Sequence, residues 1–377
     1  MKLAFIKKKF SLHGGAERYL QTLIRHLKKE GHEIHIFANQ WSEETDVIFH
    51  KVAVLPLSSF LSVVTFNRNA GTALRGAQGF DHVISFERTT CQDIYRAGEG
   101  CHAEWLAVRS KFEPFYKRLS FRINPLHLSL LAIEKRLFSR TKLIVANSNM
   151  VKSQVMNHYG VPRSRIAVVY NGVDLERFSP ENRGRWRRTV RADLGVSEGA
   201  KLILFVGSGF ARKGLGTLLR ALPLAGEDVV AVVVGRGDAE KYRALAERGG
   251  ASGRVLFVGP REQIERFYSA ADLFVLPTLY DPFSNAALEA MASGLPVITT
   301  KNNGVAELIE NGREGYALDD PGNAQDLSDK IYLSLENLDG MGKKAREKAE
   351  QFPIERAARE FTGAIEKGGS LLSDAEK

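Results

Sequence analysis

Short apolar segments alternate with helical patterns through both halves of this chain, and this alternation constrains the fold more than any other feature. In the first half the strand candidates are Leu3–Ile6, Glu33–Phe37, His82–Phe86, Leu143–Ala146 and Ala167–Val169. In the second half they are Leu202–Val206, Val229–Val234, Val255–Val258, Leu273–Leu276 and Val297–Thr299. Nearly continuous apolar strands between helices are typical of parallel sheets covered on both faces. The sequence therefore predicts an α/β protein with two doubly wound, Rossmann-like domains, each with a crevice at the carboxyl ends of its strands.

The length of 377 residues suits two domains. A polar stretch with five arginines between Arg183 and Arg191 has little apolar periodicity, and it predicts a linker. We expect an N-terminal domain over residues 1–173, a linker over 174–200, a second domain over 201–351, and a final segment over 352–377. The final segment has a helical apolar pattern, and we expect it to cross back to the first domain.

The net charge of +9 favours partners that carry negative charge, such as nucleic acid, anionic lipid or phosphorylated substrates. Cys91 and Cys101 are the only cysteines, so a disulfide framework is not expected and a cytoplasmic location is the simplest prediction. No apolar run approaches the roughly 20 residues of a membrane span. The histidines lack zinc-site spacing with cysteine, and we expect no metal.

The stretch from Asp281 to Ile298, DPFSNAALEAMASGLPVI, places two acids eight positions apart, Asp281 and Glu289. A turn followed by a helix presents backbone N–H groups and the positive end of a helix dipole to an anion. Carboxylates accept hydrogen bonds from sugar hydroxyls. The stretch is therefore suited to a nucleotide-sugar, while the alternative is an ordinary strand–turn–helix unit with solvated acids.

Two glycine-containing loops follow strand candidates. Gly207–Gly214, GSGFARKG, carries Arg212 and Lys213, whose cations suit the charge that develops on a departing diphosphate. The alternative is two solvated basic residues at a helix start, where the helix dipole disfavours cations. Gly14 and Gly15 follow the first strand, where glycine permits close approach of backbone to a phosphate or sugar. A plain tight turn is the alternative for this pair.

Taken together, these residues resemble family 4 of the retaining glycosyltransferases, which have the two-domain GT-B fold. The run from Asp281 is similar to the E-x7-E element of that family, Asn171–Phe178 to its NGVD…F passage, and Gly207–Gly214 to its phosphate loop. Within the family, GSGFARKG and Ala97–Trp105, AGEGCHAEW, look most like the lipopolysaccharide core glucosyltransferase I group. Two positions depart from the pattern: Asp281 replaces a frequent Glu, and Ser208 replaces a frequent Arg.

The resemblance implies roles for particular residues. A first-domain histidine near His102 contacts the donor sugar in the family, whereas a packed loop histidine is the alternative here. Glu99 is the candidate for acceptor contact. The implied catalytic residues are Arg212, Lys213, Asp281 and His102, and the implied donor-binding residues are Gly14, Gly15, Phe283, Ser284, Asn285 and Glu289.

The resemblance implies retaining transfer of a sugar, with glucose from UDP-glucose as donor and a lipopolysaccharide core as acceptor, by front-face attack and without a metal. Another glycan, a lipid or a small molecule remains open as acceptor. A nucleic-acid-binding protein is the alternative from charge, but no DNA or RNA module is recognisable. An NAD-dependent oxidoreductase is disfavoured, because Gly235-Arg236-Gly237 has Glu240 where the third glycine would stand.

The segment from Arg109 to Arg140 mixes basic residues with Phe112, Phe115, Tyr116 and Phe121. Such a mixture suits an interfacial segment on an anionic membrane. A pair of surface helices with aromatic core contacts and a solvated basic face explains it equally well, and both interpretations stay open.

Overall fold

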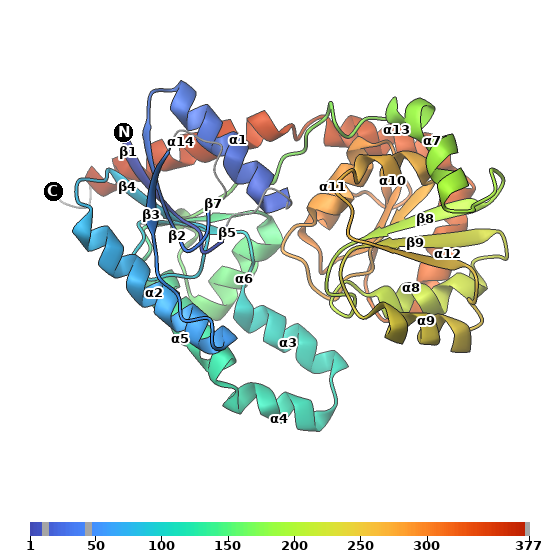
Figure 1. Cartoon of the computed structure of the whole chain (residues 1–377), viewed down its shortest axis with the longest axis horizontal. Coiled ribbons are helices and arrows are strands. Elements are labelled where there is room, and N and C mark those ends of the chain that lie inside the picture. Colours follow the sequence, from blue (N-terminus) through green and yellow to red (C-terminus); the bar gives the residue numbers. More distant parts are fainter. Residues whose placement is uncertain (10–14, 42–46, 374–377) are drawn as a thin grey trace. The chain divides into compact units, whose positions relative to one another are not determined.

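The computed structural model describes residues 1–9, 15–41 and 47–373 and divides the chain into two compact units (Figure 1). Unit 1 comprises residues 1–171 and 355–377, and unit 2 comprises residues 172–354. Each unit is built on one parallel sheet.

The sheet of unit 1 has seven described strands in the order β3-β2-β1-β4-β5-β6-β7, all paired in parallel. The strands are β1 (Lys2–Ile6), β2 (Glu33–Ala38), β3 (Ile48–Lys51), β4 (His82–Ser85), β5 (Ile94–Ala97), β6 (Leu143–Ala146) and β7 (Ile166–Val168). The helices are α1 (Gly15–Lys29), α2 (Ser59–Gly76), α3 (His102–Phe112), α4 (Phe115–Ile123), α5 (Pro125–Arg140), α6 (Asn149–Tyr159) and α14 (Ile354–Ser373). In α14, the buried Phe361 packs edge-on against Tyr19 of α1, with ring centroids 6.3 Å apart.

The sheet of unit 2 has six described strands in the order β10-β9-β8-β11-β12-β13, again all parallel. They are β8 (Lys201–Val206), β9 (Val229–Val234), β10 (Val255–Gly259), β11 (Leu273–Val275), β12 (Val297–Thr300) and β13 (Gly315–Leu318). The helices are α7 (Asn182–Asp193), α8 (Leu215–Ala221), α9 (Ala239–Arg248), α10 (Glu265–Ala270), α11 (Asn285–Ala292), α12 (Ala324–Leu335) and α13 (Leu338–Ala349).

The predicted fold class is confirmed, because both units are doubly wound parallel sheets with helices between most successive strands. All ten predicted strands are present, and β3, β5 and β13 were not predicted. Strand β3 was missed because it is largely exposed and its sequence is not continuously apolar. Strand β5 was missed because the charged Arg96 interrupts its apolar pattern.

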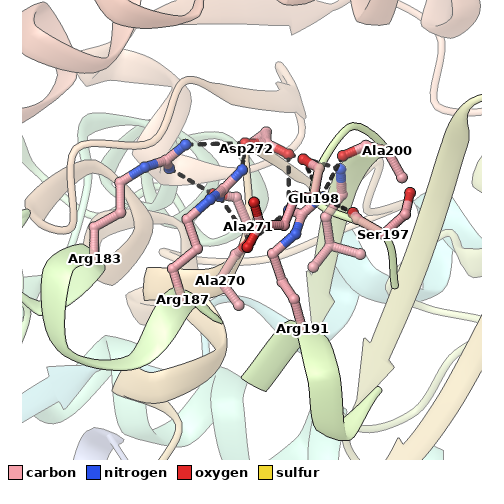
Figure 2. Close-up of polar contacts among 10 residues, drawn as sticks. Arg183, Arg187, Arg191, Ser197, Glu198, Ala200, Ala270, Ala271 and Asp272 are labelled. Carbon is pink, nitrogen blue, oxygen red and sulfur yellow. Dashed lines mark hydrogen bonds and ion pairs between the residues drawn. The ribbon is translucent and has the colours of Figure 1, made fainter. Parts of the chain in front are cut away.

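Residues 174–200, expected to form a linker, differ from that expectation because they belong to unit 2 and contain helix α7. Arg183, Arg187 and Arg191 recur every four residues along α7, and all three guanidinium groups bind the carboxylate of Asp272 (Figure 2). Their N–O distances are 3.1, 2.7 and 3.3 Å. Arg191 is buried and also donates to the backbone carbonyl of Ala270. Three of the arginines that were predicted to belong to a linker therefore attach helix α7 to the rest of unit 2 through Asp272.

The order of strands reverses once in each sheet, between β1 and β4 in unit 1 and between β8 and β11 in unit 2. In open parallel sheets, ligands bind beyond the carboxyl ends of the strands at such a switch point, because the connecting helices leave there on opposite faces. Each unit therefore has one place where its topology favours a ligand.

Candidate active site

Two of the predicted catalytic residues lie close together at the switch point of unit 2. Lys213 lies in the loop after β8, and Asp281 lies in the loop after β11. The Lys213 ammonium donates a hydrogen bond to Oδ2 of Asp281, and both side chains are buried. Burial lowers the pKa of Lys213, and the Asp281 carboxylate acts in the opposite sense. A fixed cation and a hydrogen-bond acceptor thus lie together at the carboxyl edge of the sheet.

Arg212 is fixed by the same pair of loops. Its guanidinium donates to the carbonyl of Tyr280 at 3.0 Å, and its own carbonyl accepts from the N–H of Leu279 at 2.8 Å. Gly214 closes the loop with φ +76°, and a Cβ atom there would lie 1.8 Å from the carbonyl oxygen of Pro277. The loops after β8 and β11 are therefore packed backbone to backbone, and this packing places Arg212 beside Lys213.

The predicted donor-binding segment 283–285 begins helix α11. The Oγ of Ser284 accepts from the N–H of Ala287 as the helix cap. The N–H of Ser284 already donates to Oδ1 of Asn303, 3.1 Å away. Phe283 is buried, and Asn285 is the first helical residue. In this structure Ser284 therefore holds the loop in shape, through the buried Asn303 that sequence reasoning missed.

Glu289 lies on α11, and its Oε2 accepts from the hydroxyl of Tyr268 at 3.0 Å. Tyr268 is fully buried, and its single hydroxyl proton is shared between Glu289 and the carbonyl of Ala286, whose oxygen is 2.9 Å from the hydroxyl. Because a rigid phenol holds one oxygen, the orientation of the Glu289 carboxylate is set before any ligand binds. Tyr268 is a second residue for which the sequence offered no signal.

The remaining predicted site residues belong to unit 1. Gly14 lies outside the described residues, and Gly15 is the first residue of α1. His102 begins α3 and is buried, with its Nε2 3.1 Å from Nδ1 of His127. Burial, reinforced by the charge of Arg88, lowers the pKa of His102 to about 4, so its imidazole is neutral at physiological pH.

Glu99 is half-exposed and forms an ion pair with the guanidinium of Arg88. Removal of the carboxylate from water raises the pKa of Glu99, but the charges of Arg88, Lys7 and Lys8 together outweigh this effect and hold the pKa below its usual value. Glu99 is therefore a carboxylate, able to accept hydrogen bonds from hydroxyl groups.

Glu134, on α5, organises this part of unit 1, and sequence reasoning missed it. The side chain is fully buried and accepts three hydrogen bonds, one from the loop after β4, one from α3 and one from α6. Oε1 accepts from Nε of Arg88 at 2.8 Å and from the backbone N–H of His102 at 2.7 Å. Oε2 accepts from the hydroxyl of Tyr159 at 2.5 Å. The sequence near Glu134 could not predict these partners, because they lie 25 to 46 positions away in the chain.

Neither a metal centre nor a membrane span is found among the residues that the structure describes. No cluster of three or more His, Cys, Asp or Glu side chains is arranged to hold an ion there. None of the helices in the described ranges combines the length and the apolar character needed to cross a bilayer.

Two family models match the chain, one in each half. Residues 13–177 match Glycosyltransferase Family 4, and residues 187–352 match Glycosyl transferases group 1. Lys213, Asp281 and Glu289 lie inside the second match.

Comparison with known proteins also finds glycosyltransferases. The chain is 26% identical over 348 residues to the lipopolysaccharide glucosyltransferase WaaG of Escherichia coli K12, covering 89% of this chain and 90% of that protein. The crystal structure of WaaG, a glycosyltransferase involved in lipopolysaccharide biosynthesis, matches with a TM-score of 0.82 at 24% identity and covers 95% of this chain and 98% of its own. Anabaena HepE in complex with UDP and glucose matches with a TM-score of 0.74 at 19% identity, over 97% of this chain and 100% of that one. These matches show the GT-B fold.

Proposed function

The chain belongs to the family 4 glycosyltransferases, and we propose that it is a retaining enzyme that transfers glucose from UDP-glucose to a lipopolysaccharide core acceptor. One observation carries the proposal: Lys213 and Asp281, 68 residues apart, meet at the switch point of unit 2 beside Arg212. The similarity to WaaG supports the choice of glucose and of the lipopolysaccharide acceptor, and the UDP and glucose bound to HepE support the nucleotide.

In the proposed reaction an acceptor hydroxyl oxygen bonds to the anomeric carbon while the bond from that carbon to the diphosphate breaks. The hydroxyl proton passes to an oxygen of the leaving diphosphate, on the same face of the sugar. Arg212 and Lys213 stabilise the negative charge that grows on the diphosphate, and such fixed groups contribute about 10²–10³ each in rate. The reaction needs no metal in this scheme, because the two side chains supply the positive charge.

In this proposal, carboxylates accept hydrogen bonds from the hydroxyl groups of the donor. Once the diphosphate binds Lys213, the Asp281 carboxylate becomes available to the hydroxyls of the transferred glucose. Glu289, oriented by Tyr268, accepts from the ribose hydroxyls. His102, Gly14 and Gly15 are also assigned to donor binding, on the family resemblance alone.

Calorimetric titration with UDP-, GDP- and ADP-sugars tests the donor. We expect selective binding of UDP-glucose, and Glu289→Ala should weaken it by about tenfold to a hundredfold because a hydrogen bond to a charged group is lost. Glu336→Ala removes an exposed carboxylate of the same unit and serves as the control. An unchanged dissociation constant in Glu289→Ala would contradict its role.

The stereochemistry requires a separate measurement. The anomeric configuration of the product, read from its proton coupling constant in NMR, should match that of the donor. A sugar trapped in covalent linkage to the protein would overturn the front-face scheme in favour of a double displacement.

We also propose that helix α4 docks on an anionic membrane surface at the cytoplasmic face, which brings a lipid-linked acceptor to the enzyme. Phe115, Leu119, Ile123 and Tyr116 fall on one face of this helix and are exposed, Phe115 by 78% and Ile123 by 73%. No residue of α4 is buried. An apolar face of this kind, flanked by cations, is suited to the boundary between headgroups and acyl chains.

The charges around α4 favour an anionic surface. Lys111, Lys117, Arg118 and Arg122 surround it, and Glu113 is the one acid between residues 109 and 123. Glu113 already binds Arg109 and Lys117. Arg118 donates to the backbone carbonyl of Glu113, so its positive charge is not neutralised there. Phosphatidylglycerol is the simplest lipid that would satisfy the remaining cations.

Vesicle flotation tests the membrane proposal. The protein should float with phosphatidylglycerol vesicles at low salt and remain behind with phosphatidylcholine vesicles. A variant with Phe115→Ser and Ile123→Ser should lose binding. A control with Tyr332→Ser and Leu333→Ser removes two exposed apolar residues from α12 and should float like the wild type. Flotation that persists in the α4 variant would exclude this surface.

A further inference from the structure

Helix α4 packs against its neighbours mainly through one aromatic side chain. Of the nine residues of α4, only Phe121 is partly shielded from solvent, and the others are exposed. The Phe121 ring meets the imidazole of His127, on α5, edge-on, with ring centroids 5.6 Å apart and planes at 89°. The guanidinium of Arg109, on α3, lies 4.7 Å from the centroid of the same ring. Figure 1 shows α4 at the ends of α3 and α5, away from the sheet, so Phe121 is its main packing contact with unit 1.

The contact continues from His127 to His102. Nδ1 of His127 lies 3.1 Å from Nε2 of His102, and the two ring centroids are 5.1 Å apart. The backbone of His102 is fixed separately, because its N–H donates to the buried Glu134 at 2.7 Å. An unbroken line of side-chain contacts therefore runs from Phe121 of α4, through His127, to a residue that the family resemblance assigns to donor binding.

The hydrogen bond between the two imidazoles determines what His102 offers to a ligand. Both rings are neutral at physiological pH, since burial lowers the pKa of His102 to about 4, and burial and the charge of Arg109 lower the pKa of His127. A neutral imidazole has one N–H donor and one acceptor nitrogen. If Nε2 of His102 donates to His127, Nδ1 of His102 is an acceptor, and if His127 donates instead, Nδ1 of His102 is a donor. His127 therefore sets both the orientation and the tautomer of the His102 ring.

Helix α4 presents opposite faces to solvent and to His127. Phe115, Leu119 and Ile123 recur every four residues and form the exposed apolar face. Successive residues of an α-helix are rotated by about 100°, so Phe121, two residues beyond Leu119, lies on the other side of the helix. A membrane that binds the apolar face therefore does not compete with His127 for Phe121. Instead, it restrains the helix that carries Phe121.

We propose that His127 is a positioning residue for His102 and that Phe121 links His127 to α4, so that docking of α4 on an anionic membrane strengthens donor binding. Once docking restrains α4, the entropic cost of ordering the three rings no longer has to be met when the donor binds. Because such coupling is reciprocal, the donor strengthens membrane binding by the same factor. The inference rests on the proposed function, including the docking of α4.

Calorimetric titration with UDP-glucose, with and without phosphatidylglycerol vesicles, tests the link. In the wild type these vesicles should lower the dissociation constant of UDP-glucose by at least about fivefold, whereas phosphatidylcholine vesicles should not change it. Phe121→Ala keeps the exposed apolar face and should still float with phosphatidylglycerol vesicles, but they should no longer affect its dissociation constant. Leu128→Ala, at an exposed position next to His127, is the matched control and should keep the vesicle effect.

Two results of this titration would overturn the proposal. One is a vesicle effect that survives in Phe121→Ala. The other is the absence of the effect from a wild-type protein that binds both vesicles and UDP-glucose. A wild-type protein that binds no vesicles would also overturn it, because nothing would then restrain α4.

Two substitutions of His127 test its role as a positioning residue. His127→Phe keeps an aromatic ring against Phe121 but removes the hydrogen bond to His102, so donor binding should weaken and no longer respond to vesicles. His127→Asn retains a polar atom near the position of Nδ1, and it should restore part of the donor affinity. Donor affinity in His127→Phe equal to that of the wild type would show that His127 does not position His102.

Nitrogen-15 NMR of the imidazole of His102, assigned by comparison with His102→Gln, reports its tautomer without any donor. Bicelles that contain phosphatidylglycerol should shift these resonances in the wild type but not in Phe121→Ala. If no nucleotide-sugar binds in calorimetry while this shift is observed, the proposed function fails and the link from α4 to His102 stands. If bicelles bind without a shift, the link fails even where the donor binds.

Discussion

The ammonium of Lys213 and the carboxylate of Asp281 form a buried ion pair that joins the loops after β8 and β11. Breaking a buried pair by removing one partner costs about 3–5 kcal/mol, because the remaining charge is left without compensation. Lys213→Met should therefore lower the free energy of unfolding substantially. Lys213→Met combined with Asp281→Asn should recover most of that loss, since no buried charge remains.

Catalysis should not recover in the double variant. If Lys213 stabilises the leaving diphosphate, both the single and the double variant should lose about 10²–10³ in kcat. Urea unfolding and initial-rate kinetics on the same three proteins separate the two effects. Recovery of kcat together with stability would show that Lys213 has only a structural role.

The three arginines of α7 that bind Asp272 should contribute unequally to the free energy of unfolding. The side chains of Arg183, Arg187 and Arg191 are exposed by 48, 24 and 2%, although all three bind the same carboxylate. Exposed ion pairs contribute about 0–1 kcal/mol, whereas loss of a buried partner costs several times more. Arg191→Met should therefore destabilise the protein clearly more than Arg183→Met, as measured by urea unfolding. Equal losses would mean that the three arginines act only through their summed charge.

His102 should make unfolding depend on pH. Burial lowers the pKa of His102 to about 4 from 6.5, so in acid the unfolded chain takes up a proton that the folded chain refuses. Stability must fall as the pH decreases from about 6.5 to about 4, by up to about 3 kcal/mol from this residue. His102→Gln should remove that contribution. The measurement is the difference in unfolding free energy between the two proteins at several pH values, and a constant difference would contradict the buried, neutral imidazole.

The fold was predictable because buried parallel strands are apolar along their whole length, and this signal is local. Strand β5 shows the limit: Arg96 interrupts its apolar pattern, yet the guanidinium is buried 4.2 Å from the ring of Tyr19 and donates to Asn171 at 2.5 Å. Those partners are 75 or more positions away in the chain, so no window around β5 could have revealed them.

The candidate site was predictable only as a set of residue types. The motifs indicated Lys213, Asp281 and Glu289, but not that Lys213 and Asp281 would bind each other. The residues that hold these groups, Tyr268 and Asn303, come from other elements and are visible only after folding. The arginines of α7 were misread as linker residues for the same reason, since their acceptor Asp272 lies 81 to 89 positions away.

Two glycines of the loop after β8 test how closely that loop packs against the loop after β11. Gly214 and Gly209 both have φ +76°, so alanine at either position pays the same backbone strain of roughly 1–2 kcal/mol. A Cβ at Gly214 would lie 1.8 Å from the carbonyl oxygen of Pro277, whereas a Cβ at Gly209 meets nothing within 4 Å. Gly214→Ala should therefore destabilise the protein well beyond Gly209→Ala in urea unfolding. It should also weaken UDP-glucose binding, because the neighbouring Lys213 must move with the loop. If the two variants unfold alike, the two loops are not in the close contact on which the position of Lys213 depends.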